Sequence, residues 1–410
     1  MNALISTTGG YVNEQPKRLL NKTPATAETD HWLAKADALA SVIDEHREQA
    51  EYERVTPAPV IDALRAAGVH RMWVSKDFGG GQVSLRTGSA VIQRLAAANP
   101  SVAWQMGVQG AIGRLSDYLP EQTARKLFAE NDTLVVGGVN PSGRAVPVDG
   151  GFRLSGTWAF ASGSAHADWL ICAAVVTGED GTPHMTDTGP ETRMLFVPKS
   201  ECRMLDTWHT IGLRGTGSEH FEIEETFVTE DFTVAVADML RPPAARPSRA
   251  YAIGYYDFGP FTSASTAVGT AQGALEAFKS LATRKTPAAA TNSLAGSHTV
   301  QEKLGRAEAQ LRAARLALVD AAWHAETCGE DGGDALSALI RLTAATVAEN
   351  ATSVVDTAFR LAGTTAIYTS SPLERYFRDV HTAVKHITLS HTHFETVGQY
   401  LLGGPLMMRR

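Results

Sequence analysis

Residues 151–170 read GFRLSGTWAFASGSAHADWL and carry the pattern that separates this chain from an all-helical protein. Aromatic and apolar residues fall in two short runs with glycine and serine between them, so the segment predicts a strand hairpin. Trp158, Phe160 and Trp169 supply aromatic rings, and Ser162 adds a hydroxyl. An aromatic ring beside a hydroxyl on a rigid strand suits a flat heterocycle, which stacks on the ring and hydrogen-bonds through its edge. A sandwich core with a turn serine has the same periodicity, so both interpretations stay open here.

Outward from the hairpin, the periodicity divides the chain into regions. Short β-branched and aromatic runs over 131–245 predict a small antiparallel β domain. Residues 27–130 and 246–410 carry apolar residues at helical spacing, and 1–26 read as a flexible tail. The expected fold is mainly α, with an N-terminal helical domain, the central β domain and a C-terminal four-helix bundle. The bundle helices are expected at about 261–284, 299–328, 335–362 and 373–402.

The composition is that of a globular protein rather than a nucleic-acid or membrane binder. Of 410 residues, 44% are hydrophobic and 20% charged, and the formal net charge is −7, which disfavours binding to polyanions. No apolar run reaches the roughly 18 residues of a membrane span, and the N-terminus lacks the apolar core of a secretory signal. Cys172, Cys202 and Cys328 form no CxxC pair, which favours a reducing cytoplasm.

Three segments resemble known catalytic or cofactor-binding motifs, but the residues around them do not fit those motifs. GLRGTG (212–217) precedes a strand pattern rather than a helix, so a dinucleotide loop is not expected there. FGGGQ (78–82) lacks the Lys-Ser/Thr of a phosphate-binding loop. Ser162, Ser164 and His166 lie close in sequence, but no GxSxG elbow accompanies them, so a hydrolase is not expected either.

Four histidines crowd into HTAVKHITLSHTHFE (381–395). His381, His386 and His391 are five residues apart, so on a helix each is turned by about 140° from the last and they leave any common face. No Asp or Glu precedes Glu395 in this stretch to complete a metal shell. The spacing therefore predicts no metal site, and the missing carboxylate is the more informative feature.

The segment before these histidines, SPLERYFRDV (371–380), carries Glu374, Arg375, Arg378 and Asp379 at i+3 and i+4 spacing, which predicts intrahelical ion pairs. In a helix–β–bundle chain of this length, this segment and the hairpin together resemble the acyl-CoA dehydrogenase superfamily from about residue 30 to 402. In that family a Trp-Ile-Thr-type segment packs on the flavin ring, and GTWAFASGSAHADW aligns with it without a gap.

The resemblance implies roles for three consecutive residues of the hairpin. Phe160 takes the position of the aromatic that stacks on the flavin, Ala161 follows it as a contact, and Ser162 places its hydroxyl near flavin N5. TRKTP and VQEK supply Arg284, Thr286 and Gln301 for the adenosine side of the cofactor. These residues act across a subunit contact in the dehydrogenases, so the resemblance also implies a homotetramer.

Three departures from the dehydrogenases are visible. Pro287 replaces the usual Phe after the Arg-Lys-Thr segment, and LAGTTAIY keeps only Gly363 of the family's glycine loop. The catalytic Glu expected eight residues after the Arg-Asp pair is Ile387, and Asp257 is the one acidic residue near the alternative base position. Without its general base, the chain is not expected to act on acyl thioesters.

The resemblance is stronger to one branch of this superfamily, the two-component flavin-dependent monooxygenases, which oxidise hydroxyphenylacetate, dibenzothiophene or indole. In this branch a separate reductase supplies FADH2 or FMNH2, which reacts with O2 to give a C4a-hydroperoxide whose distal oxygen passes to the substrate. The phrases that carry the resemblance are FGG, SVAW, GFRLSG, FASG…ADW, SPLERYFRDVHTAVKH and, as the most specific, DTWHTIGLRGTGS.

The branch implies two catalytic residues and a substrate pocket. Ser162 is expected to hold N5–H, and an apolar pocket to exclude water. His386 matches the histidine of the last helix that supplies a proton for the hydroperoxide. Trp104 is expected to line the flavin and substrate cavity. Ile112 stands where phenol-oxidising members carry a histidine, which favours an apolar, electron-rich aromatic such as indole.

The preferred subgroup is therefore the indole-oxidising members, including those of indole-terpenoid (xiamycin-type) biosynthesis. Three alternatives remain open. They are an acyl-CoA dehydrogenase with Asp257 as its base, an N- or S-oxygenase of the same branch, and a non-catalytic binding protein of this fold.

Overall fold

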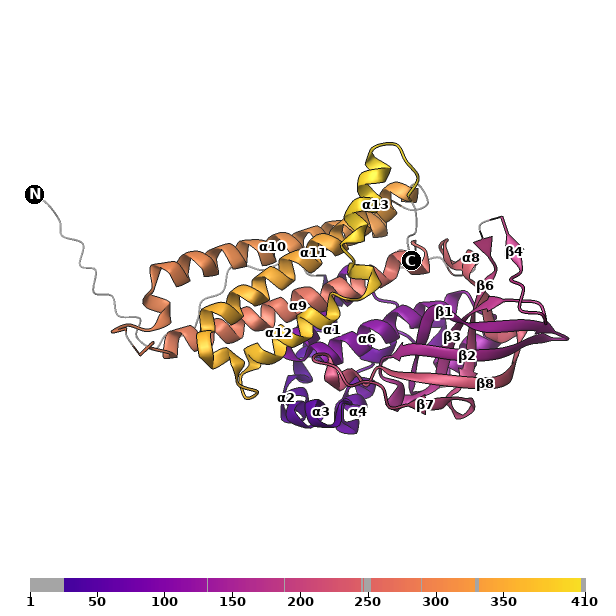
Figure 1. Ribbon diagram of the computed structural model, residues 1–410, viewed down its shortest axis with the longest axis horizontal. Coiled ribbons are helices and arrows are strands. Elements are labelled where there is room, and N and C mark those ends of the chain that lie inside the picture. Colours follow the sequence, from indigo (N-terminus) through magenta and orange to yellow (C-terminus); the bar gives the residue numbers. More distant parts are fainter. Residues whose placement is uncertain are drawn as a thin grey trace, which may run out of the picture.

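The chain folds into N-terminal helices, a central β-sheet and a long C-terminal helical bundle (Figure 1). The computed structural model describes residues 26–406 except 131, 188, 245, 247–251, 289 and 329–331. The predicted mainly α fold with a central β domain is confirmed. The predicted tail lies outside the described residues, apart from Thr26, which caps the first helix.

The N-terminal helices surround one nearly buried helix, α6. Asn99 caps it by accepting hydrogen bonds from the backbone N–H groups of Ser101 and Val102, and Pro100 occupies its first turn. Helix α6 contacts both strand β1 (Leu134–Val148) and helix α9 (Tyr255–Arg284), so it links the sheet to the bundle. The helices are α1 Ala27–Ala38, α2 Ala40–Glu45, α3 Arg47–Glu53, α4 Ala58–Ala66, α5 Leu85–Ala98, α6 Pro100–Gly113 and α7 Glu121–Ala124.

The sheet has seven strands in the order β7-β8-β2-β1-β3-β6-β9. The antiparallel prediction is wrong at one pair, because β1 and β3 are parallel. β2 runs back along β1, the chain crosses over β1 through 162–166, and β3 then starts beside the first residue of β1. The strands are β1 Leu134–Val148, β2 Gly151–Ala161, β3 Ala167–Val176, β6 Thr192–Pro198, β7 Arg203–Leu205, β8 Glu219–Thr229 and β9 Thr233–Ala235, with a separate pair β4 Met185–Thr186 and β5 Gly189–Pro190.

The bundle differs from the prediction in its fourth helix. Its helices are α9 Tyr255–Arg284, α10 His298–Thr327, α11 Gly333–Ala362, α12 Pro372–Ala383 and α13 Thr392–Leu401. The predicted helix 373–402 is broken, because His386 is extended (φ −68°, ψ 141°) and a short 3-10 turn follows it. Side chains there compete for backbone groups, as when Ser390 Oγ accepts from Thr392 N–H. The helical spacing assumed for the histidines therefore does not hold across this stretch.

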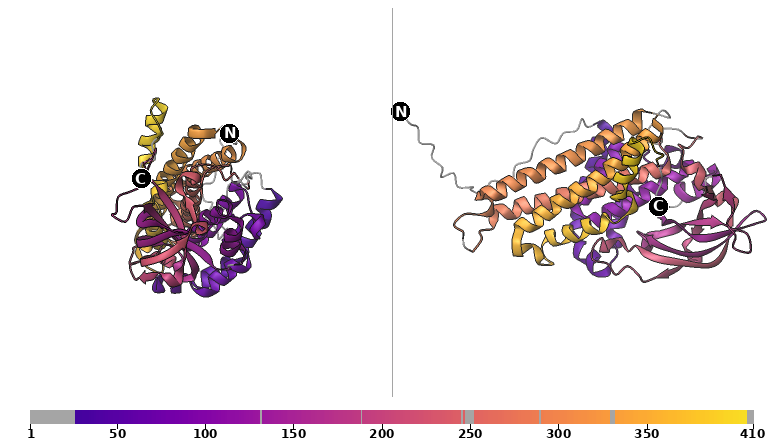
Figure 2. Two further views of the ribbon diagram at one scale, coloured as in Figure 1. Left: turned by 90° about the vertical axis from the view of Figure 1, so that its right-hand side faces the viewer. Right: turned by 45° about the horizontal axis from the view of Figure 1, so that its top comes forward.

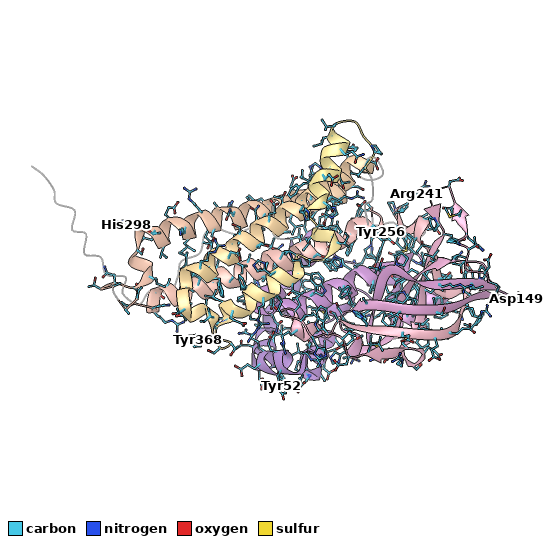
Figure 3. The ribbon with its side chains drawn as sticks, viewed as in Figure 1. Tyr52, Asp149, Arg241, Tyr256, His298 and Tyr368 are labelled. Atoms are coloured by element: carbon cyan, nitrogen blue, oxygen red, sulfur yellow. The ribbon has the colours of Figure 1, made fainter. Side chains whose placement is uncertain are left out.

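The bundle runs lengthwise away from the sheet, which packs with the N-terminal helices against one end (Figure 2). Figure 3 places His298 and Tyr368 at the far end of the bundle and Asp149 at the opposite tip of the sheet. α9 has 30 residues, about 45 Å at the helical rise, so its two ends belong to different neighbourhoods. None of the described helices has both the length and the apolar character that crossing a membrane requires.

Candidate functional site

The end of β2 presents a large aromatic ring next to a buried hydroxyl. Phe160 has φ +68°, unusual for a residue with a Cβ, and its side chain is 63% exposed. Its ring meets those of Trp208 and His220 edge-on, at centroid distances of 6.3 and 5.5 Å. Ala161 is fully buried, and Ser162 is 3% exposed. An uncovered aromatic face beside an anchored hydroxyl fits a flat cofactor ring such as a flavin.

The Ser162 hydroxyl belongs to a row of hydroxyl groups. Its Oγ lies 2.6 Å from Ser218 Oγ, which lies 2.6 Å from Thr216 Oγ1. Thr216 Oγ1 in turn donates to the Leu213 carbonyl at 2.8 Å. The backbone is fixed at the same place, because Gly163 N–H donates to the Thr216 carbonyl at 2.8 Å. No role was predicted for Thr216 or Ser218, although both lie in DTWHTIGLRGTGS (206–218), the most specific phrase.

The loop 206–218 is clamped by α12. Asp379 Oδ1 accepts from Leu213 N–H at 2.6 Å, and Arg378 donates to the Ile211 carbonyl. A Cβ on Gly212 would lie 2.3 Å from the Arg378 carbonyl oxygen, so only glycine permits this close approach. The predicted intrahelical pairing is confirmed for Arg378, which bonds Glu374, whereas Asp379 leaves its helix for the loop.

Asp379 is fully buried, and burial raises its pKa to about 7, with the nearby Glu51 carboxylate adding to the effect. Arg378 and Arg375 act in the opposite direction, as does the hydrogen bond from Leu213 N–H. The loop is therefore anchored by a carboxyl group whose ionisation is unfavourable in the folded protein.

His386 and Trp104 meet next to this loop. Their rings pack edge-on, with centroids 5.3 Å apart and planes at 78°. Trp104 also belongs to an apolar cluster with Trp208, Leu213 and Ala383. Because Trp208 contacts Phe160 as well, the cluster joins α6, the loop, α12 and the end of β2 in one neighbourhood.

The His386 imidazole is neutral at physiological pH, because burial lowers its pKa to about 4. Its Nδ1 lies 2.8 Å from Thr388 Oγ1, which lies 2.8 Å from Ser263 Oγ on α9. The His386 Nε2 atom makes no hydrogen bond with any of the described residues, so it is available to bind a ligand. His386 lies in the turn after α12, not in the last helix as the sequence suggested.

Ile112, the other expected pocket residue, lies in the main hydrophobic core and is 1% exposed. The residue beside Trp104 is Val108, one helical turn later, which packs against the apolar cluster. Helical spacing could have predicted this neighbour, because Val108 is at i+4 from Trp104, on the same helix face, whereas Ile112 is at i+8.

Arg284, Thr286 and Gly363 do not join this neighbourhood within one chain. Arg284 and Thr286 are exposed at the end of α9, and Arg284 Nε donates to the Ser280 carbonyl of its own helix. Lys285 ties this end to the Gly363 turn by donating to the Ala362 carbonyl at 2.7 Å. Arg284 lies 21 residues after Ser263 on α9, a separation of about 32 Å at the helical rise.

Other chemical groups lie apart from the site. Asp257 accepts from Ser337 Oγ at 2.5 Å in the contact of α9 with α11. Within the described part of the chain, no three His, Cys, Asp or Glu side chains are arranged to hold a metal ion. A surface depression of about 670 Å³ is lined by Arg65, His166 and Lys199 among others, and by none of the candidate residues.

Two domain profiles of one family match the chain. The acyl-CoA dehydrogenase N-terminal domain matches residues 32–127, and the acyl-CoA dehydrogenase C-terminal domain matches residues 261–391. Among solved structures, XiaF from Streptomyces sp., in complex with FADH2 and glycerol, has a TM-score of 0.87 and 24% identity over 93% of this chain and 97% of that one. This likeness shows the fold.

Two curated relatives extend over almost the whole chain. The indole-3-acetate monooxygenase of Pseudomonas putida is 29% identical and covers 94% of this chain and 97% of its own length. The oxygenase component of the FADH2-dependent resorcinol hydroxylase of Rhizobium sp. (strain MTP-10005) is 30% identical, over 94% of this chain and 98% of its own length. The chain belongs to the oxygenase components of flavin-dependent monooxygenases, within the acyl-CoA dehydrogenase superfamily.

Proposed function

We propose that this protein takes reduced FAD or FMN from a separate reductase and, with O2, hydroxylates an electron-rich aromatic compound of the indole type. The observation that carries the proposal is the joining of Phe160 and Ser162 to Trp104 and His386 through the Trp208 cluster. The relatives act on resorcinol and indole-3-acetate, both electron-rich aromatic compounds. Bound reduced flavin would supply the electrons that activate oxygen.

The residues of this chain bind, orient and hold protons around that flavin. Phe160 offers its exposed face for stacking, and Ser162 receives the N5–H hydrogen bond. His386 presents the unbonded Nε2 of a neutral imidazole, which takes and returns a proton rather than storing one. Trp104 and Val108 form an apolar wall that excludes water from the reacting atoms.

The substrate class is inferred from the α6 residues after Trp104. A phenol is activated by a base that removes its proton, and these residues supply none, because Val108 is apolar and Ile112, where phenol-oxidising members carry a histidine, lies in the core. Indole carries a nucleophilic ring carbon without deprotonation and matches an apolar wall. The dehydrogenase alternative has less support, because Asp257 is turned toward Ser337 on α11 and Ile387 replaces the catalytic glutamate.

The assembly we propose is a homotetramer in the cytoplasm. Arg284, Thr286 and Gly363 lie too far along the bundle to reach the flavin of their own chain, so they serve a neighbouring subunit. Leu316 and Trp323, seven residues apart on α10, leave half-exposed apolar side chains for such a contact. The three cysteines form no disulfide with one another, which agrees with a reducing compartment.

Supplying the protein with a flavin reductase, NADH and indole tests this function. We expect hydroxylated indole, seen as the blue pigment that forms when it oxidises in air, and no pigment with the reductase alone. A parallel anaerobic sample containing oxidised flavin and an acyl thioester should not bleach. Bleaching without any aromatic hydroxylation would support the dehydrogenase alternative instead.

A further inference from the structure

The row of hydroxyls behind Ser162 has a direction, set by the group at its far end. Three oxygen–oxygen contacts connect Ser162, Ser218, Thr216 and the Leu213 carbonyl. Each hydroxyl has one proton to donate, and a carbonyl has none. The 2.8 Å contact between Thr216 Oγ1 and the carbonyl is therefore attractive only if Thr216 donates.

The other protons follow from this first one. Since the Thr216 proton points to Leu213, Ser218 must donate to Thr216, and Ser162 must donate to Ser218. The reverse order would use only two of the three contacts and leave two buried oxygens facing each other at 2.8 Å without a proton. In the favoured order, Ser162 donates its proton to Ser218, so its oxygen has only lone pairs to offer a ligand.

The Leu213 carbonyl is held in place from several sides. Its own residue is in the left-handed region (φ 50°), and its N–H is bound by Asp379 Oδ1. Trp208 Nε1–H also donates to this carbonyl, at 3.0 Å. The end of the row is thus fixed by the loop and by α12, so a ligand at Ser162 cannot easily reverse it.

We propose that Thr216 and Ser218 are positioning residues that make Ser162 a pure hydrogen-bond acceptor, and thereby make the site select reduced over oxidised flavin. This inference rests on the proposed function. Reduced flavin carries N5–H, a donor that matches an acceptor-only Ser162. Oxidised flavin has a lone pair at N5, which would require the whole row to reverse and the Thr216 bond to Leu213 to break.

Anaerobic titration with oxidised and with chemically reduced flavin measures this selectivity as the ratio of the two dissociation constants. Wild type should bind the reduced form more tightly. In Ser218→Ala, Ser162 regains a free proton and can donate to oxidised N5, so the ratio should fall by about tenfold, mainly through tighter binding of oxidised flavin. Thr216→Val, nearly isosteric, should act in the same direction because Ser218 loses its acceptor.

Two controls separate this effect from damage to the loop. Thr216→Ser keeps the hydroxyl and should retain the wild-type ratio. Thr210→Val removes another hydroxyl of the same loop, which donates to the Gly212 carbonyl at 2.9 Å, and should leave the ratio unchanged.

Different results would contradict this inference and the proposed function. Equal loss of both affinities in Ser218→Ala and Thr216→Val, or a ratio equal to that of wild type, would overturn the direction of the row while leaving the oxygenase function intact. A wild-type protein that binds no reduced flavin would overturn the function itself, and the inference with it.

Discussion

The His386 ring packs edge-on against Trp104, with their centroids 5.3 Å apart, although the two residues are 282 positions apart in the chain. The contact is made possible by the break after α12, which turns the chain at His386 instead of continuing the helix. It places a neutral imidazole against the aromatic side chain of α6, next to the cluster that leads to Phe160. The catalytic proposal depends on this relationship.

Replacing His386 with alanine should slow the oxidation of protein-bound reduced flavin by O2, by about a hundredfold, the usual scale for a positioned acid–base group. More hydrogen peroxide should be released for each hydroxylated product. Stopped-flow absorbance of the flavin and a peroxide assay give the two quantities. His391→Ala, at an exposed position nearby, is the control, and equal rates in the two variants would remove His386 from the mechanism.

Enlarging Val108 to tryptophan should fill the space beside Trp104. We expect reduced flavin to be oxidised at close to the normal rate while aromatic product falls by at least about tenfold, because the substrate rather than the flavin is displaced. Ile112→Val is the matched change in the core and should cost about 1 kcal/mol of stability with product yield retained. A larger loss of product from Ile112→Val than from Val108→Trp would place the substrate on the other side of α6.

Gly212→Ala should loosen the loop from α12. The added Cβ meets the Arg378 carbonyl carbon and oxygen at 2.5 and 2.3 Å, so we expect a loss of about 1–3 kcal/mol in unfolding free energy together with weaker flavin binding. Gly305→Ala on α10 meets no atom within 4 Å and should stabilise the protein by about 0.5–1 kcal/mol. Denaturant unfolding of both variants checks the pair, and a Gly212→Ala protein as stable as wild type would show that the loop accommodates a side chain.

Asp379→Asn should change how stability depends on pH. The folded pKa of Asp379 is about 7, above its ordinary value, so ionisation costs the folded state and the cost grows as pH rises from about 4 to 7. The asparagine keeps an acceptor for Leu213 N–H without the charge. Its melting temperature relative to wild type should therefore rise by several degrees between pH 5 and 8.

The control for this comparison is Asp231→Asn, an exposed carboxylate, whose melting temperature should follow wild type at every pH. If the Asp379→Asn difference were flat or fell with rising pH, the buried carboxyl would be stabilised as an ion by Arg375 and Arg378. The clamp on Leu213 would then be electrostatic rather than a neutral hydrogen bond.

Periodicity was sufficient to predict the three regions, because helices and strands are decided by local apolar spacing. It failed where contacts between distant parts of the chain determine the local structure. The parallel pairing of β1 with β3 depends on a crossover of the chain, and at the break the His386 side chain accepts from Thr388 N–H in place of a helical hydrogen bond. Ser218 and Asp379 were visible in the sequence, but their roles arise only when the loop 206–218 meets both β2 and α12.

With reduced flavin, this chain is expected to transfer one oxygen atom from O2 to an aromatic ring. This transfer is tested most directly by mixing the purified protein, chemically reduced flavin and indole under ¹⁸O2, with no reductase present, and by measuring the isotope in the product by mass spectrometry. We expect one ¹⁸O atom in each hydroxylated indole, and none when the label is supplied as water. Unlabelled product, or reduced flavin consumed with peroxide as the sole oxygen-containing product across indole-type substrates, would contradict it.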